Sequence, residues 1–230
     1  MLTNIKAVFF DAGGTLLHPY PSVGEIYQKV AAQYGCLVKA QQLETLFRQE
    51  WLKRDGLANL ASHTSEKIER QWWRSLVHDI FTQVGGVNNF ENFFEELYAV
   101  FGSPDAWRLY PETLEVLEEI KKRKKRVAII SNWDSRLFKL CTALGIHERV
   151  EFILASSVFG ASKPSPEIFH EALRQTALKP EETIHVGDSF EDDIRGAHGV
   201  GMQAVLIDRH ETPREFPNVK TIRHLKELLD

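Results

Sequence analysis

The second half of the chain alternates helical and apolar segments, and this alternation constrains the fold more than any other feature. Short apolar runs predict strands at 126–132, 151–155, 183–187 and 203–207, with amphipathic segments between them. Such a rhythm is typical of a parallel sheet with helices on both faces. A further run at 5–10 lacks the period-two pattern of a half-exposed strand, so we place it in the same sheet, buried on both faces. The sequence therefore predicts an α/β fold with a parallel five-stranded sheet. The predicted helices of the second half cover 112–125, 135–144, 166–178 and 192–198.

Between the first strand and the alternating region lies a block with a different pattern. From residue 18 to 104 apolar residues recur at helical spacing in several segments, without a convincing strand, so we predict an all-helical insert. Ser22 suits the N-cap of its first helix, and Gly35 suits the end of that helix. An insert of roughly 85 residues is large enough for a small core of its own. We predict two domains, an α/β core at 1–17 and 105–230 and a helical domain at 18–104.

The composition of the 230-residue chain is that of an ordinary globular protein, and its net charge of −4 is mild. A nucleic-acid-binding protein would be more basic, so we expect no nucleic-acid partner. No apolar stretch is long enough to span a membrane, and the N-terminus leads directly into the first strand without room for a signal peptide. Cys36 and Cys141 form no CxxC pair, which favours two buried thiols in a reducing compartment. We expect a cytoplasmic monomer without a membrane partner.

Polar side chains follow the C-terminal ends of the predicted strands. Each of them alone would fit a helix cap or a solvated loop; Asp188 or Ser189, for instance, suits the N-cap of the next helix. The C-terminal ends of parallel strands, however, form one rim, which is where open α/β sheets bind ligands. Capping alone does not explain four such features on one rim. They are Asp11 after the first strand, Ser131 and Asn132 after the second, Lys163 after the third, and Asp188, Asp192 and Asp193 after the fourth.

The chemistry of these side chains points to phosphoryl transfer. Asp11 and Asp188 supply hard oxygen ligands, which suit Mg²⁺ and leave room for water and a phosphate. Lys163 and Ser131 would donate hydrogen bonds to the remaining anionic oxygens and stabilise the charge that develops during transfer. Asp11 is placed to attack phosphorus and form an aspartyl-phosphate. The glycine pair at 13–14 lets backbone N–H groups approach a bound anion closely.

The same residues, taken in order, resemble a known superfamily. DAGGTL at 11–16, IISN at 129–132, SKPSPEIF at 162–169 and HVGDSFEDDIRGA at 185–197 are together similar to the motifs of haloacid dehalogenase (HAD) hydrolases, and the likeness covers the whole chain. RQWW and FDAGGTL further resemble the REG-2-like subgroup, whose animal members are called HAD hydrolase domain-containing protein 3. The resemblance implies a Rossmann-like core with an inserted α-helical C1 cap.

The resemblance also implies roles for individual residues. Asp11 would be the nucleophile, and Ser131 and Lys163 would bind the phosphoryl group. The expected substrate-binding residues are Ala12, Gly13, Gly14 and Asn132. The expected Mg²⁺ ligands are Asp11, the Gly13 carbonyl, Asp188 and one further aspartate, either Asp193, which we prefer, or Asp192.

One position departs from the family pattern. HAD phosphatases carry a second aspartate two residues after the nucleophile, where this chain has Gly13. That aspartate protonates the leaving group and then activates water, and losing such a group should cost roughly 10² to 10⁴ in rate. Metal ligation would remain, because the position contributes its backbone carbonyl. The leading hypothesis is a Mg²⁺-dependent phosphatase for a small phosphorylated metabolite, slow on ordinary monoesters and faster on aryl or acyl phosphates.

Three alternatives stay open. A 2-haloacid dehalogenase also lacks the second aspartate, but it needs no metal and typically replaces Asp188. A phosphonatase-like enzyme has a small residue at the Gly13 position and needs a cap lysine, for which Lys29, Lys39, Lys53 and Lys67 are available. A binding module without turnover would use the same phosphate cradle, or the aromatic block around Trp72 and Trp73, although aromatic residues at this spacing more often form core. We interpret His18 as a solvated hinge residue and His185 as a core or strand-edge residue rather than a ligand.

Overall fold

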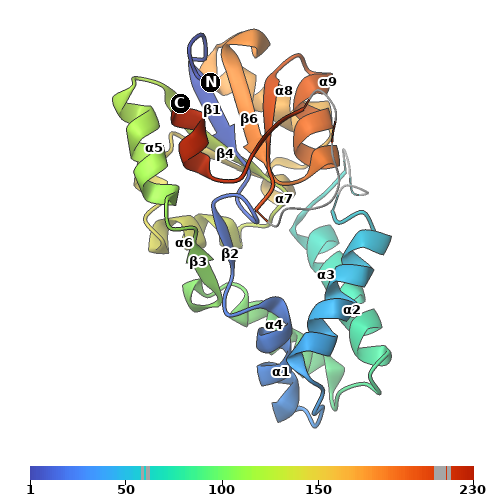
Figure 1. Cartoon of the computed structure of the whole chain (residues 1–230). Helices are drawn as coiled ribbons and strands as arrows, with labels where there is room; N and C mark the ends of the chain where they lie inside the picture. The colour runs from blue at the N-terminus through green and yellow to red at the C-terminus, as the bar shows by residue number, and fades with distance from the viewer. Residues whose placement is uncertain (58–59, 61–62, 210–215, 217–218) are drawn as a thin grey trace.

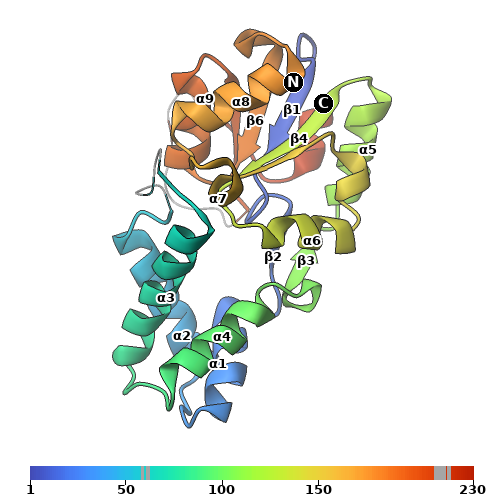
Figure 2. The same cartoon turned by 180° about the vertical axis from the view of Figure 1, so that it is seen from behind.

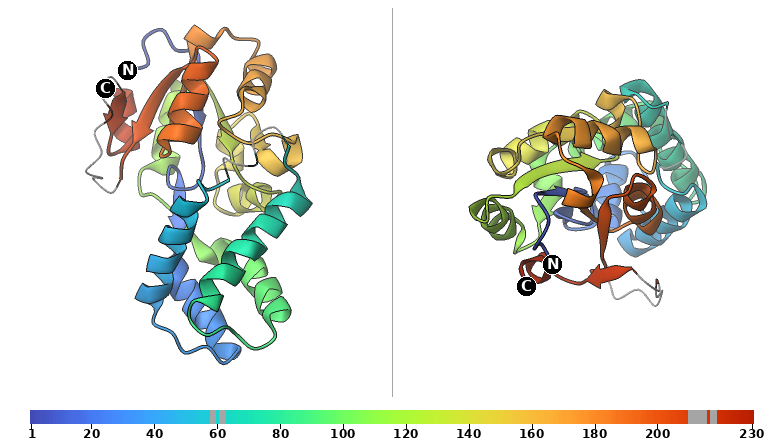
Figure 3. Two further views of the ribbon diagram at one scale, coloured as in Figure 1. Left: turned by 90° about the vertical axis from the view of Figure 1, so that its right-hand side faces the viewer. Right: turned by 90° about the horizontal axis from the view of Figure 1, so that it is seen from above.

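The structure, a computed structural model, describes residues 1–57, 60, 63–209, 216 and 219–230. Figure 1 shows an α/β part above a block of helices, and the side view in Figure 3 shows the same two parts. The first strand, β1 (Ala7–Phe10), points toward the helical block. The C-terminal rim of the sheet therefore faces the helical block. The polar residues expected to form the site lie on this rim.

The central sheet has six strands in the order β5-β4-β1-β6-β7-β8, and neighbouring strands are parallel throughout. The five predicted strands are all present. The sixth, β8, was not predicted, because it is only three residues long and two of them are exposed, so it contains no apolar run. The strands after β1 are β4 Arg126–Ser131, β5 Ile153–Ala155, β6 Thr183–Gly187, β7 Gln203–Ile207 and β8 Lys220–Ile222.

Helices cover both faces of the sheet, as the alternating pattern predicts. Val8 and Phe10 of β1 belong to an apolar cluster that includes α5 and α6, whereas Phe9 packs on the opposite face with α8 and α9. Figure 2 shows α5 on one side of the strands and α8 and α9 on the other. Since every β1 side chain is fully buried, the strand that carries Asp11 lies in the interior of the molecule. The helices are α5 Thr113–Lys122, α6 Arg136–Ala143, α7 Ser156–Phe159, α8 Pro166–Thr176 and α9 Gly196–Gly199.

The helix expected at 192–198 has a different form. Phe190–Arg195 is a π-helical turn, and α9 continues from it. The turn is wide because the Ile194 N–H reaches back to the Ser189 carbonyl, while the Ser189 hydroxyl accepts the Asp192 N–H. Single π-turns are rare and often occur at functional sites. This one directs the aspartates that follow β6.

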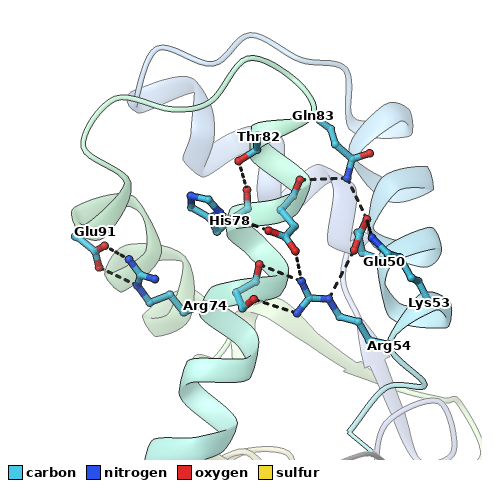
Figure 4. A network of polar contacts seen from close by, with 10 residues as sticks. Glu50, Lys53, Arg54, Arg74, His78, Thr82, Gln83 and Glu91 are labelled. Carbon is cyan, nitrogen blue, oxygen red and sulfur yellow. Dashed lines mark hydrogen bonds and ion pairs between the residues drawn. The ribbon is translucent and has the colours of Figure 1, made fainter.

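The helical block contains the helices expected for the insert. Ser22 caps the first of them, because its hydroxyl accepts the Glu25 N–H at 3.1 Å. Arg54, at the end of the second, binds Ser75 and Asp79 of the third (Figure 4). The apolar residues of the block belong to the same cluster as the α5 face of the sheet, so this core is shared with the α/β part. The helices are α1 Val23–Gln33, α2 Ala40–Lys53, α3 Glu66–Thr82 and α4 Phe90–Val100.

A short antiparallel ribbon joins the two parts. It consists of β2 (Leu17–Pro19) and β3 (Trp107–Leu109), where the chain leaves and re-enters the α/β part. Strands of three residues are too short to give a periodic signal, and β2 also contains a proline, so the sequence predicted no ribbon here. Among the described residues, no helix is both long enough and apolar enough to cross a membrane.

Candidate active site

The loop after β1 is a tight turn that requires glycine at one position. The Asp11 N–H donates to the Val186 carbonyl of β6, and the Gly14 N–H donates to the Leu17 carbonyl. Gly14 has a φ of +77°, and a Cβ placed there would lie 2.3 Å from Oδ2 of Asp188. A larger residue would therefore strain the backbone and displace the Asp188 carboxylate.

Asp11 directly follows β1 and is a buried residue, 7% exposed. Ser131, at the end of the neighbouring strand β4, donates its hydroxyl to Oδ1 of Asp11 at 2.9 Å, and the Lys163 ammonium donates to the same oxygen at 2.7 Å. Burial raises the pKa of Asp11 above its ordinary value, and the ammonium only partly opposes this effect. Asp11 and Ser131 lie close together because β1 and β4 are parallel neighbours whose C-terminal ends lie on one rim of the sheet.

Lys163 is a buried cation held between two carboxylates. It is 2% exposed, and besides Asp11 it donates to Oδ1 of Asp193 at 2.5 Å. Burial acts to lower the pKa of Lys163, but the two carboxylates outweigh it and hold the pKa above its ordinary value. Asn132 fixes the lysine backbone, because its amide donates to the Lys163 carbonyl at 2.9 Å and accepts the Lys163 N–H at 2.7 Å. The side chain of Asn132, predicted to bind substrate, thus supports the lysine loop.

Asp193 is the most completely bonded acid of the rim. Besides Lys163, the buried His185 contacts its Oδ1 through Nε2 at 2.8 Å, and the Ser189 N–H donates to its Oδ2 at 3.0 Å. Burial opposes ionisation, but Lys163 and His185 together hold the pKa of Asp193 well below its ordinary value. A Cβ at Gly187 would lie 2.1 Å from the Asp193 carboxylate carbon, so glycine makes room for this acid.

His185 is buried in β6, as its apolar neighbours indicate, but its contact with Asp193 was missed. Burial lowers the pKa of His185, which favours a neutral ring that donates its Nε2–H to the carboxylate. The two residues are eight positions apart across a strand and a π-turn. No local sequence pattern reports such a pair, because helical spacing does not apply across the turn.

Three of the predicted metal ligands meet at the rim. Asp11, Asp188 and Asp193 each offer an oxygen, and these oxygens lie within 4.8 Å of one another. Desolvation and the other two carboxylates raise the pKa of Asp188 well above its ordinary value, although part of its surface is exposed to solvent. Three carboxylates beside the one Lys163 ammonium leave an excess of negative charge, which suits a divalent cation with oxygen ligands. The residues present therefore fit Mg²⁺.

Asp192 lies outside this group of three oxygens, although it is adjacent to Asp193 in sequence. Its Oδ1 is buried and has no hydrogen-bond partner among the described residues. Burial and the neighbouring Asp193 carboxylate raise its pKa to about 7. The π-turn thus separates two aspartates that the sequence alone left as alternatives.

Trp133 covers the loop at Gly13, a contact that the motif IISN does not reveal. A Cβ at Gly13 would lie 3.2 Å from Cζ3 of the half-buried indole. The indole packs against Trp107 of the ribbon, with ring centroids 4.7 Å apart. The Trp133 N–H donates to the Ser156 hydroxyl at 3.0 Å. The space beside Gly13 is therefore filled by an aromatic ring.

The helical block reaches this region through α3. The fully buried Glu69 accepts the Ser156 hydroxyl and, at 3.0 Å, the Thr64 hydroxyl. Burial outweighs these hydrogen bonds and raises the pKa of Glu69 to about 7. One turn earlier, Glu66 accepts the Ser135 N–H at 2.7 Å. Ser156 therefore links a carboxylate of the helical block to the backbone of Trp133.

The fold and this rim define a hydrolase of the HAD class. A sequence profile of the haloacid dehalogenase-like hydrolase family matches residues 5–201, and the chain belongs to that family. It is 32% identical over 241 residues to the mouse haloacid dehalogenase-like hydrolase domain-containing protein 3, covering 99% of this chain and 94% of that protein. It is 28% identical over 221 residues to the Drosophila melanogaster rhythmically expressed gene 2 protein, covering 90% and 84%. These names confirm the subgroup that the sequence motifs indicate.

Other relatives carry names of different chemistries. A glyceraldehyde 3-phosphate phosphatase of Methanothermobacter thermautotrophicus is 34% identical over 133 residues, which is 53% of this chain and 59% of that protein. The structure of the L-2-haloacid dehalogenase of Xanthobacter autotrophicus superposes with a TM-score of 0.74 at 19% identity, covering 97% and 96%. That of a HAD phosphatase of Thermococcus onnurineus superposes with 0.65 at 24%, covering 97% and 96%. The common fold therefore supports both chemistries, and the residues of the site must decide between them.

Proposed function

We propose that this protein is a Mg²⁺-dependent phosphatase that hydrolyses a small phosphorylated metabolite through an aspartyl-phosphate on Asp11. The observation that carries the proposal is the meeting of Asp11, Asp188 and Asp193 around the buried Lys163 ammonium. Cleavage of a carbon–halogen bond needs a nucleophilic carboxylate but no metal, so it would leave the other two clustered carboxylates without a role. The relative named as a phosphatase of glyceraldehyde 3-phosphate supports a small phosphorylated substrate.

Asp11 would act as the nucleophile. Within the described residues, Ser131 and Lys163 both donate to its Oδ1, so we assign the attack on phosphorus to Oδ2. The two donors favour the ionised carboxylate, and Lys163 would then donate to the phosphoryl oxygens as charge develops there. The Gly14 N–H already donates to the Leu17 carbonyl, so Ala12 and Gly13 would contribute the backbone N–H groups to the same oxygens. Asn132 would hold Lys163 in place.

Asp11, Asp188, Asp193 and the Gly13 carbonyl are the residues that would hold Mg²⁺. When bound, the ion neutralises negative charge on the phosphoryl group. Asp193 would keep its orientation because His185, Ser189 and Lys163 bond it from three directions. We assign no metal contact to Asp192, whose carboxylate lies outside the cluster.

Gly13 makes proton transfer the weak step. With no carboxylate at that position, alkyl leaving groups would lack a general acid, at a cost of roughly 10² to 10⁴ in rate. Aryl and acyl phosphates avoid this cost because their leaving groups are weak bases. We therefore expect turnover of p-nitrophenyl phosphate and acetyl phosphate to exceed that of alkyl phosphates.

A phosphate-release panel with and without Mg²⁺ tests the proposal. Asp11→Asn should abolish release, and Asp188→Asn should abolish the response to Mg²⁺, whereas Asp192→Asn is the matched control that should keep that response. Release that survives Asp11→Asn would refute the nucleophile. Chloride release from 2-chloropropionate without metal, combined with silence on all phosphates, would replace the proposal with a dehalogenase.

A further inference from the structure

The Gly13 position is closed by a neighbouring side chain as well as lacking a carboxylate. A Cβ at Gly13 would lie 3.2 Å from Cζ3 of Trp133, which is closer than an ordinary van der Waals contact. The φ angle of Gly13 is outside the positive range that favours glycine, so the backbone itself would accept an L side chain. The obstacle to a side chain at this position is therefore the indole.

We propose that Trp133 is a specificity-determining residue that walls the leaving-group side of Asp11 and restricts the site to leaving groups that depart without a proton. The proposal rests on the proposed function and goes beyond it. The missing aspartate alone would leave an open, hydrated position, where water could donate a proton to the leaving oxygen. An indole in that position would place an apolar surface beside the bound leaving group and would exclude this substitute donor while that group is bound.

The position of Trp133 is fixed from three sides. Its N–H donates to the Ser156 hydroxyl at 3.0 Å, and its carbonyl accepts the Ser157 N–H at 3.2 Å. Its ring lies 4.7 Å from that of Trp107 in the ribbon, which is itself only 8% exposed. Ser156 in turn donates to Glu69 of the helical block. A residue held at its backbone and ring does not move aside at low cost when a side chain is added at Gly13.

Both half-reactions at this site can proceed without a general acid. Oδ2 of Asp11 forms a bond to phosphorus, and the bond from phosphorus to the leaving oxygen breaks with its electron pair on that oxygen. A phenolate or a carboxylate can depart in that form, whereas an alkoxide must take up a proton. In the second half-reaction water attacks phosphorus and loses its proton to solvent, and the Asp11 carboxylate departs. The same wall keeps a base away from that water, so the aspartyl-phosphate should be long-lived.

Combined substitution of Gly13 and Trp133 tests the wall. Gly13→Asp alone should raise turnover of an alkyl phosphate less than about threefold, because even its Cβ requires the Trp133 ring to shift. Gly13→Asp with Trp133→Ala should raise it at least about tenfold above either single variant, a gain within the range of a general acid. In the double variant kcat/KM should also depend less steeply on leaving-group pKa across a series of aryl and alkyl phosphates. Gly13→Asp with Trp133→Phe, which keeps a ring, is the matched control. In this variant kcat/KM should keep its steep dependence on leaving-group pKa.

A stability cycle tests the same contact without turnover. Gly13→Ala should increase the unfolding equilibrium constant about tenfold more in the wild-type background than in the Trp133→Ala background, since only the former holds the indole. Equal effects in the two backgrounds would overturn the proposal, as would full rescue of alkyl phosphate turnover by Gly13→Asp alone. If neither wild type nor any variant releases phosphate, the proposed function fails, and the stability cycle still decides whether the indole fills the position.

Discussion

Glu69 is a carboxylate of the helical block that the fold buries completely, and replacing it with glutamine should stabilise the protein in a pH-dependent way. The side chain is 0% exposed and accepts hydrogen bonds from Ser156 and Thr64. Its other oxygen, Oε2, is buried without a hydrogen-bond partner among the described residues. Glutamine keeps the shape and one acceptor oxygen, and it removes the charge. Any change in pH dependence therefore reports the ionisation of this one group.

The magnitude follows from the pKa in the two states. Burial raises the pKa of Glu69 from 4.5 to about 7 in the folded protein. Below pH 4.5 both states hold the proton, and ionisation costs no stability. Between pH 4.5 and 7 the unfolded chain loses the proton while the folded protein keeps it, so stability falls by about 1.4 kcal/mol per pH unit. The full loss, present above pH 7, is about 3 kcal/mol.

Urea unfolding of wild type and Glu69→Gln between pH 4 and pH 8 measures this difference. The gain in stability from the substitution should be larger at pH 8 than at pH 4 by about 3 kcal/mol. Glu91→Gln is a control of opposite sign, because the hydrogen bond from Arg74 lowers the pKa of the exposed Glu91. A gain that is the same at every pH would show that Glu69 is not buried as a titrating group, and the reasoning would fail.

Three further predictions concern the rim and the core. Gly14→Ala should remove the stabilisation by Mg²⁺ in thermal melts, because its Cβ would displace Asp188, whereas Gly86→Ala, at a positive φ with open space, should keep it. Mg²⁺ at about 100 times its Kd should stabilise the wild type by about 2.7 kcal/mol in urea unfolding, and Asp188→Asn should lose this gain. Burial raises the pKa of the Cys141 thiol to about 12, so thiol reagents at pH 8 should label it only after unfolding, as mass spectrometry would detect.

The fold was predictable where burial leaves a periodic trace in the sequence. The continuous apolar runs of β1 and β4 and the helical spacing of α1 to α4 come from side chains that face a core. The ribbon β2–β3 and the strand β8 left no trace, because each strand has three residues and is partly exposed. The segment 192–198 was predicted as a regular helix, but it begins within the π-turn at 190–195, whose extra residue per turn changes hydrogen bonding without changing composition.

The candidate site was predictable as a set of chemical types, and its contacts were not. Residues at strand ends are brought to one rim by topology alone, which explains why Asp11, Ser131 and Lys163 could be grouped from sequence. Their supports depend on the path of the chain between elements. The amide of Asn132 on the Lys163 backbone and the ring of His185 on Asp193 each join segments separated by a turn or a crossover. Periodicity carries no information about such pairs.

A chain of contacts leads from the helical block to Gly13. The effect of a missing motif residue therefore depends on which side chain occupies the space that it would fill. Glu69 of α3 accepts the hydroxyl of Ser156, that hydroxyl accepts the Trp133 N–H, and the Trp133 ring lies against the position that a Gly13 side chain would occupy. If Gly13 lay in an open loop, the site would lack only its general acid, and adding an aspartate there would restore proton transfer. Gly13 instead lies against the Trp133 ring, which the helical block helps to hold. Restoring the acid would therefore also require changes in the ring and in its contacts with the helical block. On this proposal, the substrate class of the site depends on the contact between its two parts as well as on the loop that carries Asp11.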